Sequence, residues 1–315
     1  MQGLITHQKS IMLDTSLKMP SVGRNEVLVK VMAASVTSTD VEVSQGTFNL
    51  MSKLSGSRPS VKTGLEFSGV IVEGNAHFQP EDKVFGYVHL FKEPKTHQEY
   101  IAVSQDYMAH MPATLSFEEA ASLPLGALTS LVALQELANV GTNDHVLING
   151  AAGGVGIYAI QIAKLLGARV TAVAGPNQEA FLSQLGADHV INYKETAIQN
   201  LPSQFDVIFE LTTKVAFKDI QHLLSARGQF IPANPFKALV DIAANTIRAK
   251  KTKYLMVTQG SQHKLQSITG WIEEGKLSAY HDSVFALSDY QEAFVRSQIS
   301  GKQGSVVLKI IDSAT

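Results

Sequence analysis

The chain has 315 residues, a length that predicts two domains or one domain with a long insertion. Its 26 basic and 28 acidic residues give a formal net charge of −2, which offers no electrostatic case for a nucleic-acid or anionic-membrane partner. Cysteine is absent, which excludes disulfides, thiolate nucleophiles and cysteine-ligated zinc.

The N-terminal residues, MQGLITHQKS, lack the cationic start and apolar core of a secretory signal. No uninterrupted apolar run approaches the ~20 residues of a membrane span. We therefore expect a cytoplasmic protein with a small-molecule substrate and no membrane partner.

The first part of the chain, to about residue 115, is predicted to be rich in strands. Short apolar runs separated by Gly, Pro and Asn turns are typical of strands. Such runs occupy residues 25–36, 66–74 and 82–90, and residues 97–112 add one more strand and a loop. Several strands at this close spacing favour a partly closed barrel over a parallel sheet.

The pattern changes near Phe117, where a helical segment extends to Leu137, with interruptions expected at Pro124 and Gly126. Strands and helices then alternate, and we predict a doubly wound parallel sheet of the α/β class. Its predicted strands are residues 145–149, 169–174, 189–193, 205–211 and 228–234, with YLMVTQG (254–260) as a sixth strand at the edge.

After Trp271 the chain contains a predicted helix and a terminal strand, SVFALSDYQEAFVRSQIS and GSVVLKI. This pair resembles the first part of the chain more than the parallel sheet. We therefore predict a discontinuous substrate domain, residues 1–116 plus 261–315, with a dinucleotide-binding domain, residues 117–260, inserted into it.

A glycine-rich turn, NGAAGGVGIYAIQIAK (149–164), follows the first predicted strand of the parallel sheet. Gly150, Gly153 and Gly156 have the spacing G-x-x-G-x-x-G, and Gly154 is an additional glycine. The missing Cβ atoms allow a tight turn and close approach of a pyrophosphate, which the N–H groups of the following helix would face. We expect a nicotinamide dinucleotide here; the alternative is a turn that serves only to pack the helix on the sheet.

The turn after the second strand of this sheet indicates which dinucleotide is preferred. NAD-preferring sites place Asp or Glu there, about 20 residues after the glycines. This chain has GPNQ at residues 175–178, without a carboxylate or a cation. A neutral turn does not repel a 2′-phosphate, so NADPH is favoured over NADH. Tyr193 and Lys194 would supply a hydroxyl and a cation; the alternative is an ordinary strand end with a solvated lysine.

GAAGGVGIYAIQIAKLLGARV (150–170), followed by LGADHVINYKE (185–195), closely resembles the zinc-independent quinone oxidoreductases of the medium-chain dehydrogenase/reductase superfamily. ASLPLGALTSLVAL (121–134) and GLEFSGVIVEG (64–74) match further superfamily blocks in the same order. The resemblance covers essentially the whole chain and implies a GroES-like β-barrel domain joined to a Rossmann domain. It also implies NADPH-dependent hydride transfer to a quinone or an α,β-unsaturated carbonyl.

The resemblance implies roles for individual residues. The residues implied to surround the cofactor are Thr129, Ala152, Gly153, Gly154, Val155, Gly175, Asn177, Gln178, Tyr193 and Asn234. Those implied on the catalytic or substrate side are Thr37, Phe48, Leu65 and, beside the nicotinamide, Thr129. Relatives commonly pair the sheet edge, here YLMVTQG, across a two-fold axis, so a homodimer is expected; the alternative is an edge covered by the chain's own C-terminal helix.

Two positions separate this chain from the zinc-dependent relatives, which carry G-H-E where Gly64-Leu65-Glu66 stand and a Cys in place of Thr37. The ligands of a catalytic zinc are therefore missing, and the ten histidines show no paired metal spacing. His89 and His97 are expected to be loop histidines without a metal role.

The chain also departs from the quinone-reductase pattern, which often has Asn-Pro at Thr37-Ser38 and a Tyr near Phe48. Phe48 and Leu65 are expected to favour a flat, apolar acceptor. Thr37 or Thr129 would donate a hydrogen bond to its carbonyl oxygen. Two alternatives stay open: an enoyl-thioester reductase, and an NADPH-binding sensor or structural protein with little turnover.

Overall fold

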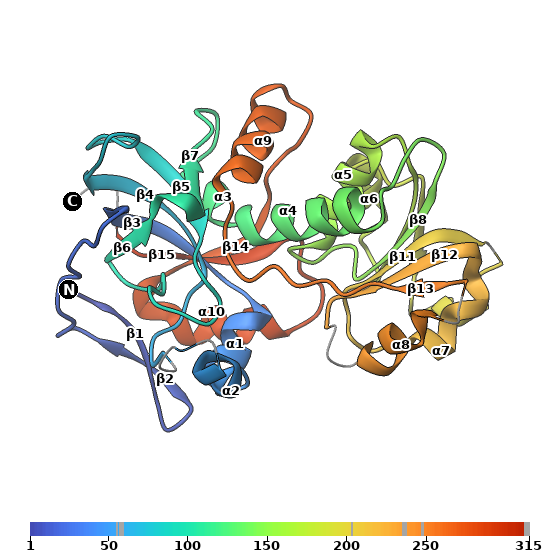
Figure 1. Ribbon diagram of the computed structural model, residues 1–315, viewed down its shortest axis with the longest axis horizontal. Coiled ribbons are helices and arrows are strands. Elements are labelled where there is room, and N and C mark those ends of the chain that lie inside the picture. Colours follow the sequence, from blue (N-terminus) through green and yellow to red (C-terminus); the bar gives the residue numbers. More distant parts are fainter. Residues whose placement is uncertain (55, 57–59, 203, 235–237, 247–248, 312–315) are drawn as a thin grey trace. The chain divides into compact units, whose positions relative to one another are not determined.

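The computed structural model describes residues 1–315 apart from 55, 57–59, 203, 235–237, 247–248 and 312–315 (Figure 1). The chain divides into two compact units. Unit 1 comprises Met1–Leu125, Thr258–Ile299 and Ser305–Thr315, and unit 2 comprises Gly126–Val257 and Ser300–Gly304. The sequence predicted a domain of residues 1–116 plus 261–315 and a second domain of residues 117–260. These predicted bounds remain a proposal.

Unit 1 is built on a mainly antiparallel sheet with the order β14-β15-β3-β4-β5-β7. Its longest strand, β3, changes partner along its length: residues 26–30 pair with β6 and residues 33–36 pair with β15. The strands are β3 (Glu26–Val36), β4 (Glu66–Glu73), β5 (Lys83–Tyr87), β6 (Tyr100–Ser104), β7 (Met108–His110), β14 (His281–Ala286) and β15 (Ser305–Lys309), and a separate hairpin joins β1 (Gly3–His7) to β2 (Ser10–Asp14). Strands from both ends of the chain thus share one sheet.

The helices of unit 1 are short and begin at residues that cap them. Thr37 and Asp40 form a capping box at the start of α1, and Ser116 and Glu119 form another at α3, which satisfies N–H groups that a helix leaves unpaired. The helices are α1 (Ser38–Ser44), α2 (Asn49–Leu54), α3 (Phe117–Ala121), α9 (Gln262–Glu273) and α10 (Tyr290–Gln298), with 3-10 turns η1 (Gln105–Tyr107) and η7 (Leu287–Asp289).

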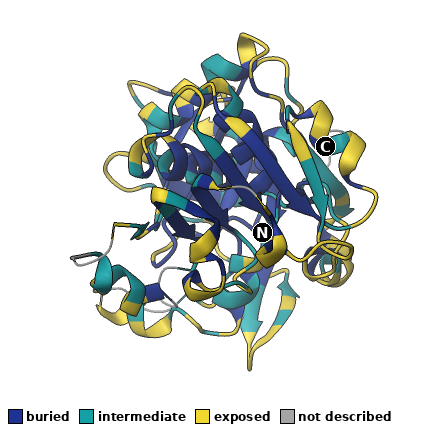
Figure 2. Cartoon of the chain, turned by 90° about the vertical axis from the view of Figure 1, so that its right-hand side faces the viewer, coloured by how far each residue is buried: buried dark blue, intermediate teal, exposed yellow. Residues whose placement is uncertain are grey.

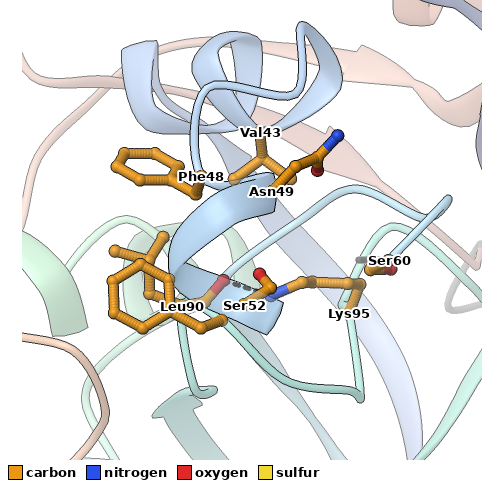
Figure 3. A pocket seen from close by; sticks show the side chains of 8 residues that line it. Val43, Phe48, Asn49, Ser52, Ser60, Leu90 and Lys95 are labelled. Atoms are coloured by element: carbon orange, nitrogen blue, oxygen red, sulfur yellow. Dashed lines mark hydrogen bonds between the residues drawn. The ribbon is translucent and has the colours of Figure 1, made fainter. Parts of the chain in front are cut away.

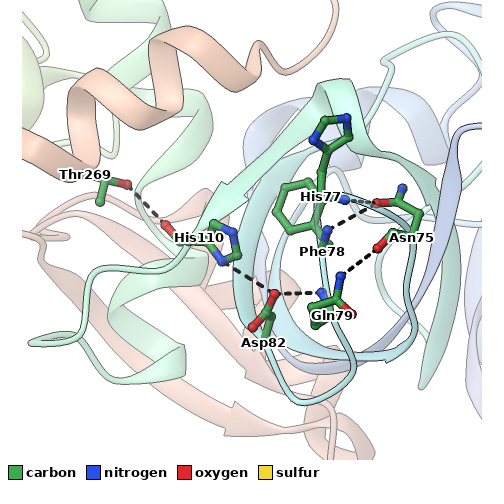
Figure 4. Close-up of polar contacts among 7 residues, drawn as sticks. All are labelled: Asn75, His77, Phe78, Gln79, Asp82, His110 and Thr269. Atoms are coloured by element: carbon green, nitrogen blue, oxygen red, sulfur yellow. Dashed lines mark hydrogen bonds and ion pairs between the residues drawn. The ribbon is translucent and has the colours of Figure 1, made fainter.

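The turn between β4 and β5 is closed by side-chain hydrogen bonds (Figure 4). Asn75 Oδ1 accepts from the backbone N–H groups of His77 and Phe78, and Asp82 accepts from the backbone of Gln79 at 2.7 Å. On the neighbouring strand, Thr269 of α9 donates to the carbonyl oxygen of His110 at 3.2 Å. This bond ties a C-terminal helix to the N-terminal sheet.

Unit 2 contains a fully parallel six-stranded sheet in the order β10-β9-β8-β11-β12-β13. This is the strand order of a doubly wound dinucleotide-binding fold, with its switch point between β8 and β11. The strands are β8 (His145–Asn149), β9 (Arg169–Ala174), β10 (His189–Asn192), β11 (Phe205–Glu210), β12 (Leu224–Pro232) and β13 (Lys251–Thr252). The predicted α/β class and parallel sheet are confirmed.

Helices connect these strands, as right-handed crossovers between parallel strands require. α5 packs on β8 and β9, and α6 packs on β10. The helical elements are α4 (Pro124–Leu131), the π-helix η2 (Val132–Leu137), α5 (Gly156–Leu165), α6 (Glu179–Gln184), η3 (Ile198–Asn200), α7 (Phe217–Ile220), η4 (Gln221–Leu223), α8 (Leu239–Ala243) and η6 (Ala244–Thr246). Buried residues concentrate in the strands, whereas exposed residues follow the turns (Figure 2). Most residues of α5 are also buried.

The predicted helix over 117–137 is present but is interrupted elsewhere. The break falls at residues 122–123, and Pro124 is the first residue of α4, where its missing N–H costs nothing. Gly126 lies inside α4 rather than breaking it. Its role is a close approach, because a Cβ there would lie 2.1 Å from the carbonyl oxygen of Gly154.

The prediction that YLMVTQG forms the sixth strand was wrong. That strand is β13, which pairs with β12 through Lys251 and Thr252, and residues 254–260 have no strand structure. The physical reason is a competing set of backbone bonds: the carbonyl oxygen of Thr258 accepts from Leu90, and the N–H of Gly260 donates to Tyr87, both at 2.7 Å.

Candidate functional site

The glycine turn follows β8, at the switch point of the parallel sheet. Gly150 has φ +91°, a conformation that favours glycine, and a Cβ on Gly156 would lie 2.5 Å from the carbonyl oxygens of Gly150 and Ala151. The α-helix α5 begins at Gly156. At Gly153, in contrast, a Cβ would meet only one atom, the oxygen of Gly150, at an ordinary 3.5 Å. The space beside the turn at Gly153 is therefore not filled by the described residues.

Three contacts that sequence reasoning missed hold this turn in place. Gly126 of α4 lets that helix approach Gly154, and the Ser130 hydroxyl donates to the carbonyl oxygen of Val155 at 3.1 Å. On the other side, the N–H of Gly304 donates to the carbonyl oxygen of Ala152 at 2.9 Å. The turn is thus braced by α4 and by residues 300–304, which belong to the same unit. Only the small residues in ASLPLGALTS hinted at the first of these contacts.

The ends of β9 and β10 bring together residues that were predicted to surround the adenosine phosphate. A Cβ on Gly175 would lie 3.5 Å from the hydroxyl of Tyr193, whose side chain is 45% exposed, so these two positions are adjacent. The Lys194 ammonium lies 5.8 Å from the centre of the Tyr193 ring. Asn177 is exposed with φ +62°, a conformation that Asn tolerates better than most residues.

Gln178 differs from its neighbours because its side chain is buried. It accepts a hydrogen bond from Gln303 at 3.0 Å, and it is the N-cap of α6. The partner is 125 residues away in the chain. Gln178 therefore connects the turn after β9 to Gln303. Its predicted contact with the cofactor remains a proposal.

At the ends of β8 and β11, Asn149 and Glu210 are both buried and hydrogen-bonded to each other. Burial raises the pKa of Glu210, although Thr212 donates to it through its hydroxyl and its backbone N–H. Beyond this pair lies a cavity of about 120 Å³, whose lining includes Glu210, Phe230 and Asn234. Asn234 thus lies at the same edge of the sheet as the glycine turn, as carboxyl ends of parallel strands require.

In unit 1, the predicted residue Thr37 is bound to Asp40. The Thr37 hydroxyl and backbone N–H both donate to Asp40 Oδ2, at 2.7 and 2.8 Å. The other oxygen, Oδ1, accepts from the backbone of Gly64 at 3.1 Å. Asp40 is fully buried, so this carboxylate joins the start of α1 to the GLE segment. The proton of the Thr37 hydroxyl is consequently engaged within the protein.

Glu66 and His97 are buried polar residues that both bond to Ser35. Glu66 accepts from the Ser35 hydroxyl and, at 2.7 Å, from the N–H of Leu125, and burial raises its pKa to about 8. His97 Nε2 donates to the carbonyl oxygen of Ser35 at 2.8 Å, which leaves Nδ1 to accept from Thr63. Burial lowers the pKa of His97, so the ring is neutral. Leu65 itself is completely buried.

His89 and His97 were predicted to be loop histidines without a metal role. His89 and His97 both lie in the connection between β5 and β6, as expected of loop residues, but they are buried rather than solvated. His89 Nδ1 accepts from the N–H of Phe91 at 3.1 Å, and burial lowers its pKa to about 4. In the part of the chain that the structure describes, no group of three or more His, Asp or Glu side chains has the arrangement of a metal site.

Phe48 immediately precedes α2. Its ring packs on that of Phe91, with centroids 5.8 Å apart and planes tilted by 55°. It lines a small cavity together with Lys95, below the start of α2 (Figure 3). Thr129, the fourth predicted catalytic residue, is half-buried in α4 and belongs to unit 2 with the cofactor residues.

Comparison with known proteins identifies the family. Residues 23–138 match the family described as "Alcohol dehydrogenase GroES-like domain", and residues 185–308 match "Zinc-binding dehydrogenase". The "Quinone-oxidoreductase QR1, chloroplastic" of Triphysaria versicolor is 30% identical over 311 residues, which cover 92% of this chain and 91% of the relative. The chain belongs to the medium-chain dehydrogenase/reductase superfamily.

Two further similarities agree with this membership. The human "NAD(P)H oxidoreductase RTN4IP1, mitochondrial" is 29% identical over 91% of this chain and 82% of the relative. The solved structure of the quinone oxidoreductase from Coxiella burnetii has a TM-score of 0.81 and 28% identity, with 98% of both chains covered. The predicted combination of a GroES-like domain and a Rossmann-like parallel sheet is confirmed. The relatives support nicotinamide-dependent oxidoreduction in general terms.

The relatives from Triphysaria versicolor and human are named as chloroplastic and mitochondrial, so the cytoplasmic location expected from the sequence stays a prediction. Among the described helices, none has the length and apolar character needed to cross a membrane.

Proposed function

We propose that this protein is an NADPH-dependent, zinc-independent oxidoreductase that transfers hydride to a quinone or an α,β-unsaturated carbonyl. The observation that carries the proposal is the glycine turn at the switch point of the parallel sheet, in a chain whose relatives include named quinone oxidoreductases. The substrate is a small molecule with a conjugated carbonyl, which the apolar ring of Phe48 suits.

The residues of unit 2 fit a dinucleotide. Gly153, Gly154 and Val155 would face the pyrophosphate, because a side chain at Gly153 would enter space that the fold leaves open. The N–H groups at the start of α5 supply donors and a positive dipole end for that anion. Ala152, Thr129 and Asn234 would line the nicotinamide half.

The preference for NADPH rests on charge. Residues 175–178 contain no carboxylate, so the turn after β9 does not repel a 2′-phosphate. The exposed Tyr193 and Lys194, adjacent to Gly175, would supply a hydroxyl donor and a cation to that phosphate. Asn177, which is exposed in the same turn, would add an amide donor.

The task of the protein in hydride transfer is positioning and charge stabilisation. A bound nicotinamide supplies the hydride, and it must come within roughly 3–3.5 Å of the electrophilic carbon. Negative charge then develops on the carbonyl oxygen of the acceptor, where a hydrogen-bond donor lowers the barrier. Of the two predicted hydroxyls, Thr37 already donates to Asp40, so Thr129 is the better donor.

The residues do not fit a catalytic zinc, although one matched family is described as zinc-binding. The chain has no cysteine, and Leu65 is completely buried at the position where zinc-dependent relatives have histidine. The hydroxyl of Thr37 is bound to Asp40. We therefore propose a reaction in which no metal polarises the carbonyl.

We also propose a cytoplasmic homodimer. β13 is the last strand of the parallel sheet and has one strand partner among the described residues. On its other edge the Asn245 side chain bonds the backbone N–H and carbonyl oxygen of Thr252, so a second copy would pack against side chains there and would not extend the sheet. A sedimentation experiment at micromolar concentration should show a dimer, and a monomer would refute this part of the proposal.

Titration of the protein with NADPH, followed by addition of acceptor, tests the proposed function. NADPH fluorescence should change on binding, and the NADPH should then be consumed when 1,4-benzoquinone or an alkenal is added. Binding without consumption across a broad acceptor panel would favour a sensor. Turnover with acyl thioesters but not with free enones would favour an enoyl-thioester reductase.

A further inference from the structure

Lys95 is a buried cation that neither the family resemblance nor the proposed mechanism uses. Its side chain is only 1% exposed and lies in the connection between β5 and β6. The ammonium donates to the carbonyl oxygens of His89 and Leu90, both at 2.9 Å. An ammonium has three N–H donors, and within the described part of the chain these two carbonyls are its hydrogen-bond partners. One N–H therefore remains for a ligand.

The charged groups around Lys95 do not occupy the position of its third N–H. Glu93 and Asp40 attract the ammonium, but each carboxylate makes its hydrogen bonds elsewhere: Glu93 with Ser60, and Asp40 with Thr37 and Gly64. His89 and Lys92 are the other titratable groups nearby. A buried ammonium without an ion pair is costly unless its donors are satisfied.

A small cavity lies at this ammonium. Its volume is about 10 Å³, enough for one water-sized group, and it is lined by Val43, Phe48, Asn49, Ser52, Ser60, Leu90, Phe91 and Lys95. In Figure 3 the Lys95 side chain extends below Asn49 toward Leu90 and Ser52. Asn49 is exposed and Phe48 is half-buried, so the rim of the cavity reaches the surface of unit 1. Phe48 and Phe91 form an aromatic wall beside it.

We propose that Lys95 and this cavity form an oxygen-binding subsite that selects acceptors carrying an anionic oxygen substituent, such as hydroxyquinones. The cavity holds one oxygen atom but no ring, so the substituent would enter it and the acceptor ring would lie against Phe48. The inference rests on the proposed function, because Phe48 is the residue that the family resemblance places on the substrate side. An anionic oxygen satisfies the third N–H and neutralises the buried charge at once.

Equilibrium binding of two matched naphthoquinones to the full-length protein, measured without NADPH, tests the subsite. The probes are 2-hydroxy-1,4-naphthoquinone, which is anionic at pH 7, and 2-methyl-1,4-naphthoquinone, which is neutral. We expect the hydroxyquinone to bind the wild type at least about tenfold more tightly, the effect of one charge-assisted hydrogen bond. Lys95→Met should abolish the preference, and Lys92→Met, at an exposed lysine of the same connection, should retain it.

The pH dependence of the wild type provides a test that needs no variant to fold. Burial lowers the pKa of Lys95 to about 8, so the preference should be complete at pH 6.5 and should decline as the pH rises through that value. Equal binding of the two quinones, or a preference that persists in Lys95→Met or above pH 9.5, would show that the cavity holds only an ordered water. Turnover is measured separately: Lys95-dependent binding without NADPH consumption would refute the proposed function and retain the subsite.

Discussion

Replacement of Glu66 by glutamine should stabilise the protein in a pH-dependent way. Glu66 is 1% exposed, and its burial, with a smaller effect of the Asp40 charge, raises its pKa to about 8 from 4.5. Between these two values the folded protein keeps the carboxyl protonated while the unfolded chain ionises it. The folded state therefore binds more protons, and its stability falls as the pH rises through this window.

The size of the effect follows from the difference between the two pKa values. One pH unit corresponds to about 1.4 kcal/mol, so the penalty reaches about 5 kcal/mol above pH 8. Glutamine does not ionise, and its carbonyl oxygen can accept from the Leu125 N–H that now donates to Glu66 at 2.7 Å. Its amide can donate to the Ser35 hydroxyl. The variant should match the wild type near pH 4.5 and exceed it progressively toward pH 8.

Urea unfolding followed by tryptophan fluorescence measures this difference. The only tryptophan, Trp271, lies in α9 of unit 1, the unit that contains Glu66. Glu73→Gln is the control, because Glu73 is exposed at the end of the same strand. A gain for Glu66→Gln that is equal at pH 5 and pH 8 would refute the argument from burial, as would an equal pH dependence in the control.

Three further predictions concern the cofactor site. Gly153→Ala should leave the melting temperature nearly unchanged, because the added methyl group meets only the carbonyl oxygen of Gly150, at 3.5 Å. The same methyl group enters the space beside the turn, so NADPH binding should weaken at least tenfold in a fluorescence titration. Gly156→Ala should lower the melting temperature by several degrees, since its methyl group meets backbone oxygens at 2.5 Å; an unchanged melting curve would contradict the strained geometry. Lys194→Met should reduce kcat/KM for NADPH about tenfold and leave that for NADH unchanged, and an equal loss with both cofactors would remove Lys194 from the phosphate site.

The local features of the cofactor site could be predicted from the sequence. The glycine turn, the apolar strands around it and the neutral GPNQ segment are each continuous in the chain, and their periodicity and glycine spacing depend on local geometry. For this reason the turn lies after β8 as predicted, and Gly175 and Tyr193 lie side by side at the ends of neighbouring strands.

Contacts between distant segments could not be predicted. The bond of Gln178 to Gln303 spans 125 residues, and Gly304 reaches Ala152 from the far end of the chain. YLMVTQG has the composition of a strand, but Thr258 and Gly260 bind Leu90 and Tyr87 instead of a sheet. Propensity describes what a segment can form alone, and competing tertiary bonds decide the outcome.

The central claim is metal-free hydride transfer from NADPH to a conjugated carbonyl, and its most direct test is turnover of protein freed of metal. The protein is treated with chelator, its zinc content is verified as negligible, and NADPH absorbance is followed with and without 1,4-benzoquinone. We predict oxidation of NADPH that depends on the quinone, runs at the same rate before and after chelation, and is not increased by added zinc. Loss of the activity on chelation with recovery on addition of zinc, or no acceptor-dependent oxidation, would contradict the account.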